Sequence, residues 1–464
     1  MILSTVSAEK PVPVLGNWVD NRFVEMANDI ETLPVTTPHI GAVIAHVPVS
    51  GSAQVDAAVE SAQRAFEAWS TLTWHARAQY LIRLHGALTQ HIDELIDLVV
   101  KEHGKNRVEA RGDVQRGMEV LEYAISLPNV AMGRIEEVSR GFHCRDERVP
   151  LGVVASVVPF NFPFMVPFWT LPIAIGCGNT MILKPSEKVP LTMTRVAEIA
   201  KGVLPPGVLN LVHGDKSTVE LLVSHAGVQA LTFVGTTAVA EQIYQACTRV
   251  GKRVLALGGA KNHLVAYPDC DIDLAAQDIV NSFSGCAGER CMAGSVLLIV
   301  DKDGGLTMDG AEPKTFADRL LARVLEVAGD VEPGTDESPR AMGPVIDEAS
   351  LERIAGCIAR AEGEEGARVL LDGRTSAKFK ARRAESGGCW IGPTVLLHRS
   401  VEDSTLHTEI FGPVLSVVVC GSAEEAIAIE NANQYGNAAI IYTSTGEVAD
   451  WFTRRFRAGM LGVN

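Results

Sequence analysis

Cys291 is the residue whose type and surroundings most directly suggest chemistry. It lies in the glycine-flanked segment GCAGERCMAG at residues 285–294, where the backbone could approach a substrate closely. The thiolate is the nucleophilic form of cysteine, and the neighbouring Arg290 favours that form. Position alone leaves two alternatives open, a nucleophile and a buried structural thiol, and Cys286 in the same segment is a competing candidate.

Asn161 lies between two prolines in the segment PFNFP at 159–163, directly after an apolar run that ends at Val158. In open α/β sheets the carboxyl ends of the strands face the ligand crevice. An asparagine held there could donate its amide hydrogens to an oxyanion. The alternative is an asparagine that only completes a turn, which is its commoner use beside proline.

Lys184 and Glu187 follow a second apolar run, in the segment KPSE. A cation and a carboxylate at a strand end could hold the hydroxyls of a ribose. Most such pairs are instead solvated loop residues, so the spacing alone leaves both interpretations open.

Two shorter segments have residue types that could bind other parts of a nucleotide. Gly235 and Thr236 precede a predicted helix whose N-terminus could meet a pyrophosphate. The segment does not match the Gly-x-Gly-x-x-Gly fingerprint and is weak alone. Glu409 and Phe411 lie in EIFGP, a predicted turn before a strand, where such residues usually serve packing.

The composition is that of a globular protein of two or three domains. The 464 residues are 47% hydrophobic and 21% charged, which is typical of packed chains and not of disordered or fibrous ones. The net charge is −15. Such an acidic chain repels phosphate backbones, so we expect no nucleic acid partner.

The nine cysteines are scattered, odd in number and not accompanied by a secretion signal, which predicts reduced thiols. They form no matched Cys-x-x-Cys pairs, so we predict no structural metal. Apolar stretches are interrupted by prolines and too short to span a bilayer. We therefore expect a cytoplasmic protein with no membrane partner.

These side chains must be positioned by regular elements, and the hydrophobic pattern predicts two kinds. A hairpin is expected at residues 16–24, and helices at 55–69 and 81–99, with a third that starts near Asp113 and carries Arg116. The polar stretch from Thr375 to Glu385 is expected to be a surface loop.

From residue 151 onward, short β-branched runs alternate with helical segments, which predicts parallel sheets covered by helices. The predicted strands are 151–158, 180–183, 208–212, 230–234, 253–257, 263–267 and 295–300. The simplest division is two α/β domains joined near Gly258 and Gly259.

The order of these segments resembles the aldehyde dehydrogenase superfamily from about residue 15 to the end. The matching motifs are PFNFP at 159–163, KPSE at 184–187, GTTAVA at 235–240, LGG at 257–259, the Cys291 turn and EIFGPV at 409–414. The resemblance implies two doubly wound parallel-sheet domains plus a β bridging or oligomerisation element. It assigns 1–132 and 150–258 to an NAD-binding domain, 259–442 to a catalytic domain, and 133–149 and 443–464 to the bridging element, whose end we expect to be incomplete.

Within the superfamily the chain is most similar to the coenzyme A-acylating branch that oxidises methylmalonate semialdehyde. GAKNH at 259–263 and GERCMA at 288–293 carry this similarity. Hydrolytic members have a glutamate two residues before a Gly-Gly or Gly-Ala pair, where this chain has Ala256 or Leu257. Neither residue can act as a base toward water, so a thioester should persist until a thiol arrives.

The resemblance also implies the chemistry. Cys291 would attack the aldehyde, and Asn161 would help to hold the oxyanion. The resulting acyl group would lose CO₂ and pass to coenzyme A, giving propanoyl-CoA or acetyl-CoA. Arg290 and Arg116 resemble the pair that binds the substrate carboxylate, although Arg116 could equally be a surface arginine. The alternative activity is a hydrolytic, NAD-dependent oxidation of another acidic semialdehyde.

The cofactor implied is NAD, because Glu187 beside Lys184 would repel a 2′-phosphate. Phe160 resembles the aromatic residue beside the nicotinamide, and the resemblance places Glu409 on its ribose. By the same resemblance Phe411 lies near the ring, and Gly235 and Thr236 line the pyrophosphate. The other expected partners are the semialdehyde, coenzyme A and further copies of the chain, as a dimer or tetramer.

Three positions depart from the family pattern. Ala240 stands where many relatives have glycine, and Thr237 where this branch has another polar residue. Glu289 adds a carboxylate beside the Cys291 turn, which leaves the identity of the semialdehyde open.

Overall fold

The computed structural model describes residues 12–25, 29–302, 306 and 313–464. Contacts divide the chain into two compact units. The first unit contains the described residues up to Thr37, together with Ala42–His103 and Ala110–Gly258. The second unit contains Pro38–Gly41, Gly104–Glu109 and Gly259–Asn464. The two short excursions, 38–41 and 104–109, therefore place residues from the amino-terminal part of the sequence in the second unit.

The first unit is built on a seven-stranded sheet in the order β11-β10-β7-β8-β9-β1-β2. Neighbours from β11 to β9 are parallel, and β1 pairs antiparallel with β9 and β2. The strands are β1 (Trp18–Val19), β2 (Arg22–Phe23), β7 (Val153–Val157), β8 (Thr180–Lys184), β9 (Leu209–Leu211), β10 (Val228–Val234) and β11 (Arg253–Leu257). The hairpin and strands predicted here from the sequence are confirmed.

Helices cover this sheet and bury two apolar clusters, because strands with apolar side chains on both faces need a cover on both. The larger cluster includes Leu84, Phe164 and Phe168, and the smaller includes Val59 and Ile243. The helices are α1 (Ser52–Trp69), α2 (Trp74–Thr89), α3 (Ile92–His103), α4 (Arg107–Ile125), α5 (Leu127–Val130), α6 (Met165–Gly176), α7 (Leu191–Ala200), α8 (Lys216–Ser224) and α9 (Thr237–Arg249).

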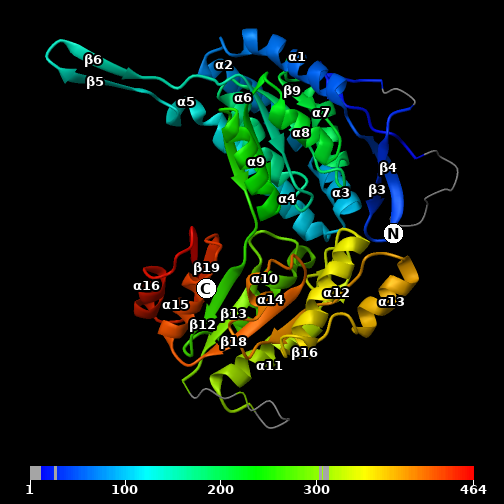
Figure 1. Ribbon diagram of the computed structural model, residues 1–464, viewed down its shortest axis with the longest axis vertical. Coiled ribbons are helices and arrows are strands. Elements are labelled where there is room, and N and C mark those ends of the chain that lie inside the picture. Colours follow the sequence, from blue (N-terminus) through cyan, green and yellow to red (C-terminus); the bar gives the residue numbers. More distant parts are fainter. Residues whose placement is uncertain (1–11, 26–28, 303–305, 307–312) are drawn as a thin grey trace. The chain divides into compact units, whose positions relative to one another are not determined.

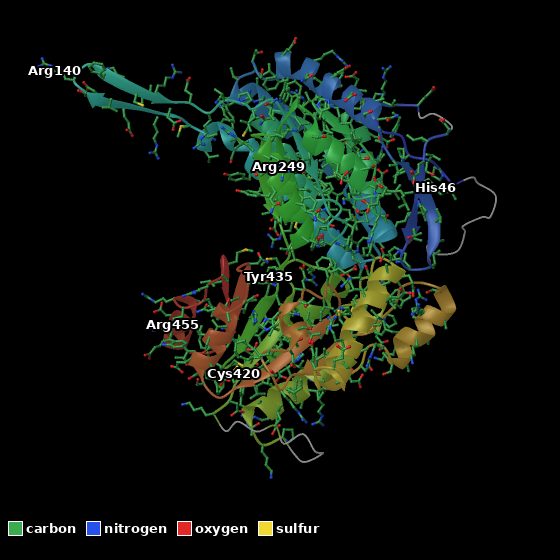
Figure 2. All side chains as sticks on the ribbon, in the orientation of Figure 1. His46, Arg140, Arg249, Cys420, Tyr435 and Arg455 are labelled. Atoms are coloured by element: carbon green, nitrogen blue, oxygen red, sulfur yellow. The ribbon has the colours of Figure 1, made fainter. Side chains whose placement is uncertain are left out.

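Two antiparallel pairs complete the first unit. β3 (Thr32–Thr37) pairs with β4 (Ala42–Pro48), and β5 (Arg134–Ser139) pairs with β6 (Phe142–Asp146). Every residue of β5 and β6 is exposed. Figure 2 shows Arg140 at the tip of this hairpin, which extends away from the helices beside it.

The second unit contains a seven-stranded sheet in the order β16-β17-β18-β13-β12-β19-β20. All neighbours are parallel except β16 and β17. The strands are β12 (Asn262–Ala266), β13 (Gly294–Val300), β16 (Arg368–Leu371), β17 (Thr394–Leu397), β18 (Val414–Cys420), β19 (Ala438–Tyr442) and β20 (Met460–Val463). A separate parallel pair joins β14 (Glu332–Pro333) to β15 (Ala341–Met342).

The helices of the second unit bury three apolar clusters against this sheet and its loops. They are α10 (Ile272–Ser284), α11 (Phe316–Gly329), α12 (Glu348–Gly363), α13 (Ala377–Ser386), α14 (Ser404–His407), α15 (Ala423–Asn431) and α16 (Gly446–Thr453), with a 3-10 turn, η1, at Gly285–Gly288. Figure 1 shows the helices and strands of this unit from green to red. The expected fold class, two α/β domains with largely parallel sheets, is confirmed.

Three local predictions were wrong. The single helix expected at 81–99 is two helices, α2 and α3, separated by a turn at Gln90 and His91. The stretch from Thr375 to Glu385 is mostly α13 and not a loop, because Phe379 is buried and anchors a helix whose other side chains are largely polar. The helix predicted to start near Asp113 begins at Arg107, where Asn106 accepts the Glu109 N–H at 2.9 Å and caps it. Among the residues that the structure describes, no helix is long and apolar enough to cross a membrane.

Candidate active site

The loop that carries Cys291 begins in η1 with an unusual backbone. Cys286 and Ala287 have φ of 49° and 52°, and Gly288 has φ of 72°. A left-handed conformation is costly for residues that carry a side chain and usually persists where the surroundings fix it. A Cβ on Gly288 would lie 2.1 Å from the Gly412 carbonyl oxygen, so this turn packs directly on the EIFGP turn.

The backbone at Cys291 is fixed by two amide side chains. Asn262 donates from Nδ2 to the Cys291 carbonyl at 2.9 Å, and Asn437 donates from Nδ2 to the same oxygen at 3.0 Å. Asn262 is the first residue of β12, and Asn437 immediately precedes β19. Neither amide was predicted to be functional, although Asn262 lies within the GAKNH segment.

Burial raises the pKa of the Cys291 thiol above its ordinary value. The N–H groups of Cys291 and Met292 and the charge of Arg290 act in the opposite direction, and the charge of Glu409 adds to the rise. Arg290 therefore favours the thiolate as expected from the sequence, but burial outweighs it. The protein without ligands holds Cys291 mainly as a thiol at neutral pH.

This raised pKa predicts how Cys291 reacts with iodoacetamide when no cofactor or substrate is bound. Only the thiolate reacts, so the alkylation rate should still be rising with pH where an ordinary thiol, with a pKa of about 8.5, reaches its plateau. The measurement is mass spectrometry of the peptide that contains Cys291, with the exposed Cys144 in the same digest as an internal reference for the reagent. A rate that reaches its plateau below pH 8 would contradict the burial argument.

Glu409 is half-buried beside the start of β12. Its Oε1 accepts the N–H of Ala260 at 3.1 Å. Burial raises the pKa of Glu409, while the Ala260 N–H and the charges of Lys261 and Arg353 lower it. Lys261 is itself fully buried, and burial lowers its pKa to about 8. The sequence analysis did not single out Lys261, whose charge acts directly on this carboxylate.

The turn after Glu409 is held from α12. Phe411 has a left-handed φ of 52°. Arg353 donates hydrogen bonds to the Ile410 carbonyl and, at 3.4 Å, to the Phe411 carbonyl. The guanidinium therefore fixes the backbone on which both Glu409 and Phe411 are mounted, another contribution that the motif alone did not indicate.

The Arg290 guanidinium lies against the backbone of Gly285. A Cβ on that glycine would lie 1.0 Å from Arg290 Nη2, so no other residue fits there without moving the arginine. Nη2 donates to the Asn281 carbonyl at 3.2 Å and lies 3.4 Å from Glu109 Oε1. Arg290 thus already has a carboxylate neighbour, which the sequence did not predict.

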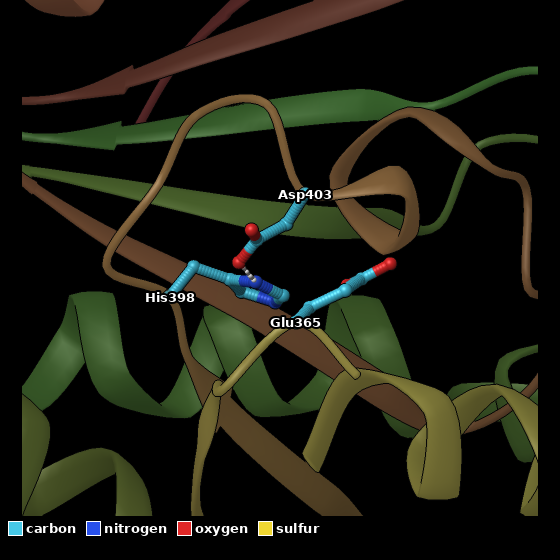
Figure 3. A group of neighbouring side chains, drawn as sticks. All are labelled: Glu365, His398 and Asp403. Atoms are coloured by element: carbon cyan, nitrogen blue, oxygen red, sulfur yellow. Dashed lines mark hydrogen bonds and ion pairs between the residues drawn. The ribbon is translucent and has the colours of Figure 1, made fainter. Parts of the chain in front are cut away.

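A separate group of titratable side chains lies in the same unit. Glu365, His398 and Asp403 place oxygen and nitrogen atoms within 4.8 Å of one another (Figure 3). His398 Nδ1 bonds to Asp403 Oδ2 at 2.7 Å, and Glu365 accepts hydrogen bonds from the hydroxyls of Ser404 and Thr405. Both carboxylates therefore have protein partners. Burial lowers the pKa of His398, and the positive charge of Lys261 adds to this shift and opposes a cation there.

In the first unit, Phe160 and Asn161 follow β7, as predicted. Asn161 is buried, and the ring of Phe160 lies 6.1 Å from that of His103 and 5.1 Å from Lys188 Nζ. β7 and β8 are adjacent and parallel, with Val157 opposite Lys184. The structure therefore brings the Phe160 and Lys184 segments to the same edge of one sheet.

Lys184 is buried at the end of β8. Its Nζ donates to the carbonyls of Gly214 at 2.7 Å and Pro185 at 2.8 Å, and lies 3.4 Å from Glu187 Oε2. Burial lowers the pKa of Lys184, and the charge of Glu187 opposes that shift. His213, which the sequence analysis missed, is also buried, and burial with the charge of Lys184 lowers its pKa to about 3. It is therefore neutral at physiological pH.

Gly235 and Thr236 lead into α9 at the end of β10. A Cβ on Gly235 would lie 2.5 Å from the Phe233 ring, so the close approach requires glycine. Thr236 is the N-cap of α9 but makes no side-chain cap hydrogen bond. The N-terminus of α9 is exposed, with backbone N–H groups that could receive an anion. Ala240 is buried on the core side of α9, so its methyl group does not occupy that end.

The structure distinguishes the two positions at which a general base could stand. Ala256 on β11 packs against the smaller apolar cluster of the first unit. The next side chain, Leu257, points to the other face of the strand and is 39% exposed. Leu257 is therefore the position that could present a side chain to a ligand, and it carries no ionisable group.

Arg116 lies on the solvent-facing side of α4. Its side chain is 70% exposed, and Nη1 pairs with Glu119 Oε2 at 2.7 Å on the same helix. This placement leaves its predicted role in carboxylate binding open, since an exposed arginine can serve a ligand or the solvent.

The sequence profile of the aldehyde dehydrogenase family matches residues 23–464. Malonate-semialdehyde dehydrogenase 1 of Geobacillus thermodenitrificans (strain NG80-2) is 40% identical over 456 residues, which are 98% of this chain and 90% of that protein. The solved structure of methylmalonate-semialdehyde dehydrogenase from Oceanimonas doudoroffii has a TM-score of 0.90 and 35% identity, covering 97% of this chain and 89% of that chain. A putative methylmalonate-semialdehyde dehydrogenase from Sinorhizobium meliloti 1021, solved in complex with NAD, also has a TM-score of 0.90 and 35% identity. That match covers 97% of this chain and 89% of the other. The resemblance stated from the sequence is thus confirmed, and the chain belongs to the aldehyde dehydrogenase family.

Proposed function

We propose that the protein is an NAD-dependent, coenzyme A-acylating dehydrogenase of malonate semialdehyde and methylmalonate semialdehyde. One observation carries the acylating part: the exposed position, Leu257, and the partly buried one, Ala256, both carry apolar side chains, so neither supplies a base for water. Relatives named malonate-semialdehyde dehydrogenase, 40% identical over 98% of the chain, support the substrate.

The steps follow from the chain's own residues. The Cys291 thiolate attacks the aldehyde carbon, and its backbone N–H and the Asn161 amide stabilise the oxyanion. Bound NAD supplies a hydride acceptor. The acyl group then remains on Cys291 as a thioester. Its β-carboxylate leaves as CO₂ while the carbonyl accepts the electron pair as an enolate, and a proton from water at the α-carbon restores the thioester carbonyl. The thiol of coenzyme A attacks the same carbonyl, releasing acetyl-CoA or propanoyl-CoA and regenerating Cys291.

The residues of the first unit fit a dinucleotide. The exposed N-terminus of α9, with Gly235 and Thr236, suits a pyrophosphate, because its N–H groups are not used by a side-chain cap. Lys184 and Glu187, only 3.4 Å apart, suit the adenosine ribose, and the carboxylate disfavours a 2′-phosphate. Phe160 would face the nicotinamide in this proposal.

In the second unit, Glu409 would bind the ribose of the nicotinamide, with Phe411 near the ring. The Ala260 N–H at 3.1 Å orients the carboxylate. Arg290 and Arg116 are proposed to bind the substrate carboxylate, because charge-assisted hydrogen bonds from guanidinium suit that group.

Steady-state oxidation of matched substrates tests the proposed substrate class. Malonate semialdehyde should exceed propanal, the neutral aldehyde of the same chain length, by on the order of tenfold in kcat/KM, because a charged hydrogen bond is worth about 1.5–3 kcal/mol. NADP in place of NAD should lower kcat/KM for the cofactor. Equal kcat/KM for the two aldehydes would contradict a carboxylate-binding site.

We further propose that the protein is a cytoplasmic homo-oligomer, a dimer or tetramer. The hairpin of β5 and β6 supports this, since its apolar side chains Ile135, Val138 and Phe142 are each more than half exposed and would be covered by another copy. None of the nine cysteines forms a disulfide, which suits a reducing compartment.

A further inference from the structure

Glu109 reaches the Cys291 loop from the beginning of α4. Its own N–H donates to Asn106 Oδ1 at 2.9 Å, and the Asn106 N–H donates to Glu109 Oε2 at 3.3 Å. This reciprocal pair fixes the carboxylate and leaves Oε1 directed at the loop. There Oε1 accepts the Cys286 N–H at 2.6 Å and lies 3.4 Å from Arg290 Nη2. One carboxylate oxygen therefore contacts both the strained turn and the arginine.

Arg290 is restrained but not enclosed. The backbone of Gly285 and the Asn281 carbonyl fix Nη2, while the side chain remains 29% exposed and that of Glu109 16% exposed. Both side chains line a cavity of about 440 Å³ within the second unit. A ligand carboxylate can therefore reach this guanidinium only in the presence of a fixed internal carboxylate.

Two carboxylates near one guanidinium oppose each other. Glu109 partly neutralises Arg290 and repels a second anion, and it is held in place whether or not a ligand is present. We propose that Glu109 determines how strongly Arg290 binds the substrate carboxylate, because the internal and the substrate carboxylates compete for the same charge. This inference rests on the proposed function, in which Arg290 binds that carboxylate.

A purely structural role for Glu109 makes a different prediction. If the contact between Glu109 and the Cys286 N–H only supports the loop, loss of this contact should lower kcat/KM for all aldehydes by the same factor. If its charge limits the affinity of Arg290 for a substrate carboxylate, removing the charge alone should raise kcat/KM for acidic aldehydes and leave kcat/KM for neutral aldehydes unchanged. Glu109→Gln separates the two, because the glutamine oxygen can still accept the Cys286 N–H.

The experiment compares kcat/KM for malonate semialdehyde and propanal, at saturating NAD and coenzyme A, in the full-length enzyme. Glu109→Gln should raise the acid-to-neutral ratio about two- to fivefold, the range of a partly exposed ion pair. Glu109→Asp, which withdraws the carboxylate by one carbon, should raise it less and serves if the glutamine variant does not fold. Glu348→Gln is the matched control, since Glu348 pairs with Arg383 at 2.6 Å in the same unit, does not line this cavity and should not change the ratio.

Arg290→Gln in the same assay separates this inference from the proposed function. A ratio that falls in Arg290→Gln and rises in Glu109→Gln supports both. If the acid-to-neutral ratio falls in Arg290→Gln but stays the same or falls in Glu109→Gln, the proposed competition is wrong. Arg290 would then still be the residue that binds the substrate carboxylate. An unchanged ratio in Arg290→Gln removes that role of Arg290 and the competition with it.

Discussion

A Cys291→Ala enzyme should lose NAD-dependent aldehyde oxidation by a factor on the order of 10⁴ or more, because no other group can form the acyl thioester. The substitution is small, and the backbone at this position is held by Asn262 and Asn437 through the carbonyl of residue 291 and not through the thiol. Folding should therefore be preserved. Stopped-flow detection of NADH, with circular dichroism of the variant, measures both effects.

Cys286→Ala is the control variant that shows which of the two cysteines in the loop is the nucleophile. Cys286 is buried in the same loop, and its backbone N–H donates to Glu109 at 2.6 Å, a bond that alanine retains. Alanine loses only the contact of the thiol with Arg290, which Glu109 and the Asn281 carbonyl still hold. This enzyme should keep its activity within a few-fold of the unmodified protein. Loss of activity in Cys286→Ala with retention in Cys291→Ala would transfer the nucleophile to Cys286.

A Leu257→Glu enzyme should acquire turnover that does not need coenzyme A. In hydrolytic members of the family a glutamate stands two residues before a glycine pair, and the exposed Leu257 is the position here that could present one. General base catalysis contributes about 10²–10⁴-fold, so thiol-independent hydrolysis should rise at least tenfold even with imperfect geometry. Free acid product, quantified by chromatography without coenzyme A, is the readout.

Ala256→Glu is the matched control in the alternative register. Ala256 packs against the core of the first unit, so a carboxylate there would be partly desolvated and should lower the thermal stability without creating hydrolysis. If Ala256→Glu hydrolyses the thioester and Leu257→Glu does not, the assignment of the base position from side-chain exposure is wrong.

The fold could be predicted from the sequence because both sheets are built from buried parallel strands. Runs such as Val153–Val157 and Thr180–Lys184 are apolar on both faces, and this pattern leaves few alternatives. Prediction failed at α13 because one buried side chain, Phe379, stabilises a helix whose other residues are mostly charged. A single tertiary contact of this kind leaves little periodic pattern in the sequence.

The candidate site was predictable only where its residues form short motifs. Cys291 and Glu409 each lie in a glycine-containing segment that the sequence displays, but their supporting contacts come from distant segments. Asn437 reaches Cys291 across 146 residues, and Glu109 reaches Cys286 across 177. The raised pKa of Cys291 was also hidden, because it depends on burial that only the folded chain creates.

The most direct test of the central claim is a time course of NADH formation from malonate semialdehyde, with and without coenzyme A. Without the thiol, the enzyme should release about one NADH per Cys291 in a burst and then nearly stop, because the thioester has no efficient acceptor. Adding coenzyme A should restore steady turnover and yield acetyl-CoA. Equal steady-state rates in the two conditions, with a free acid as the product, would contradict the acylating mechanism.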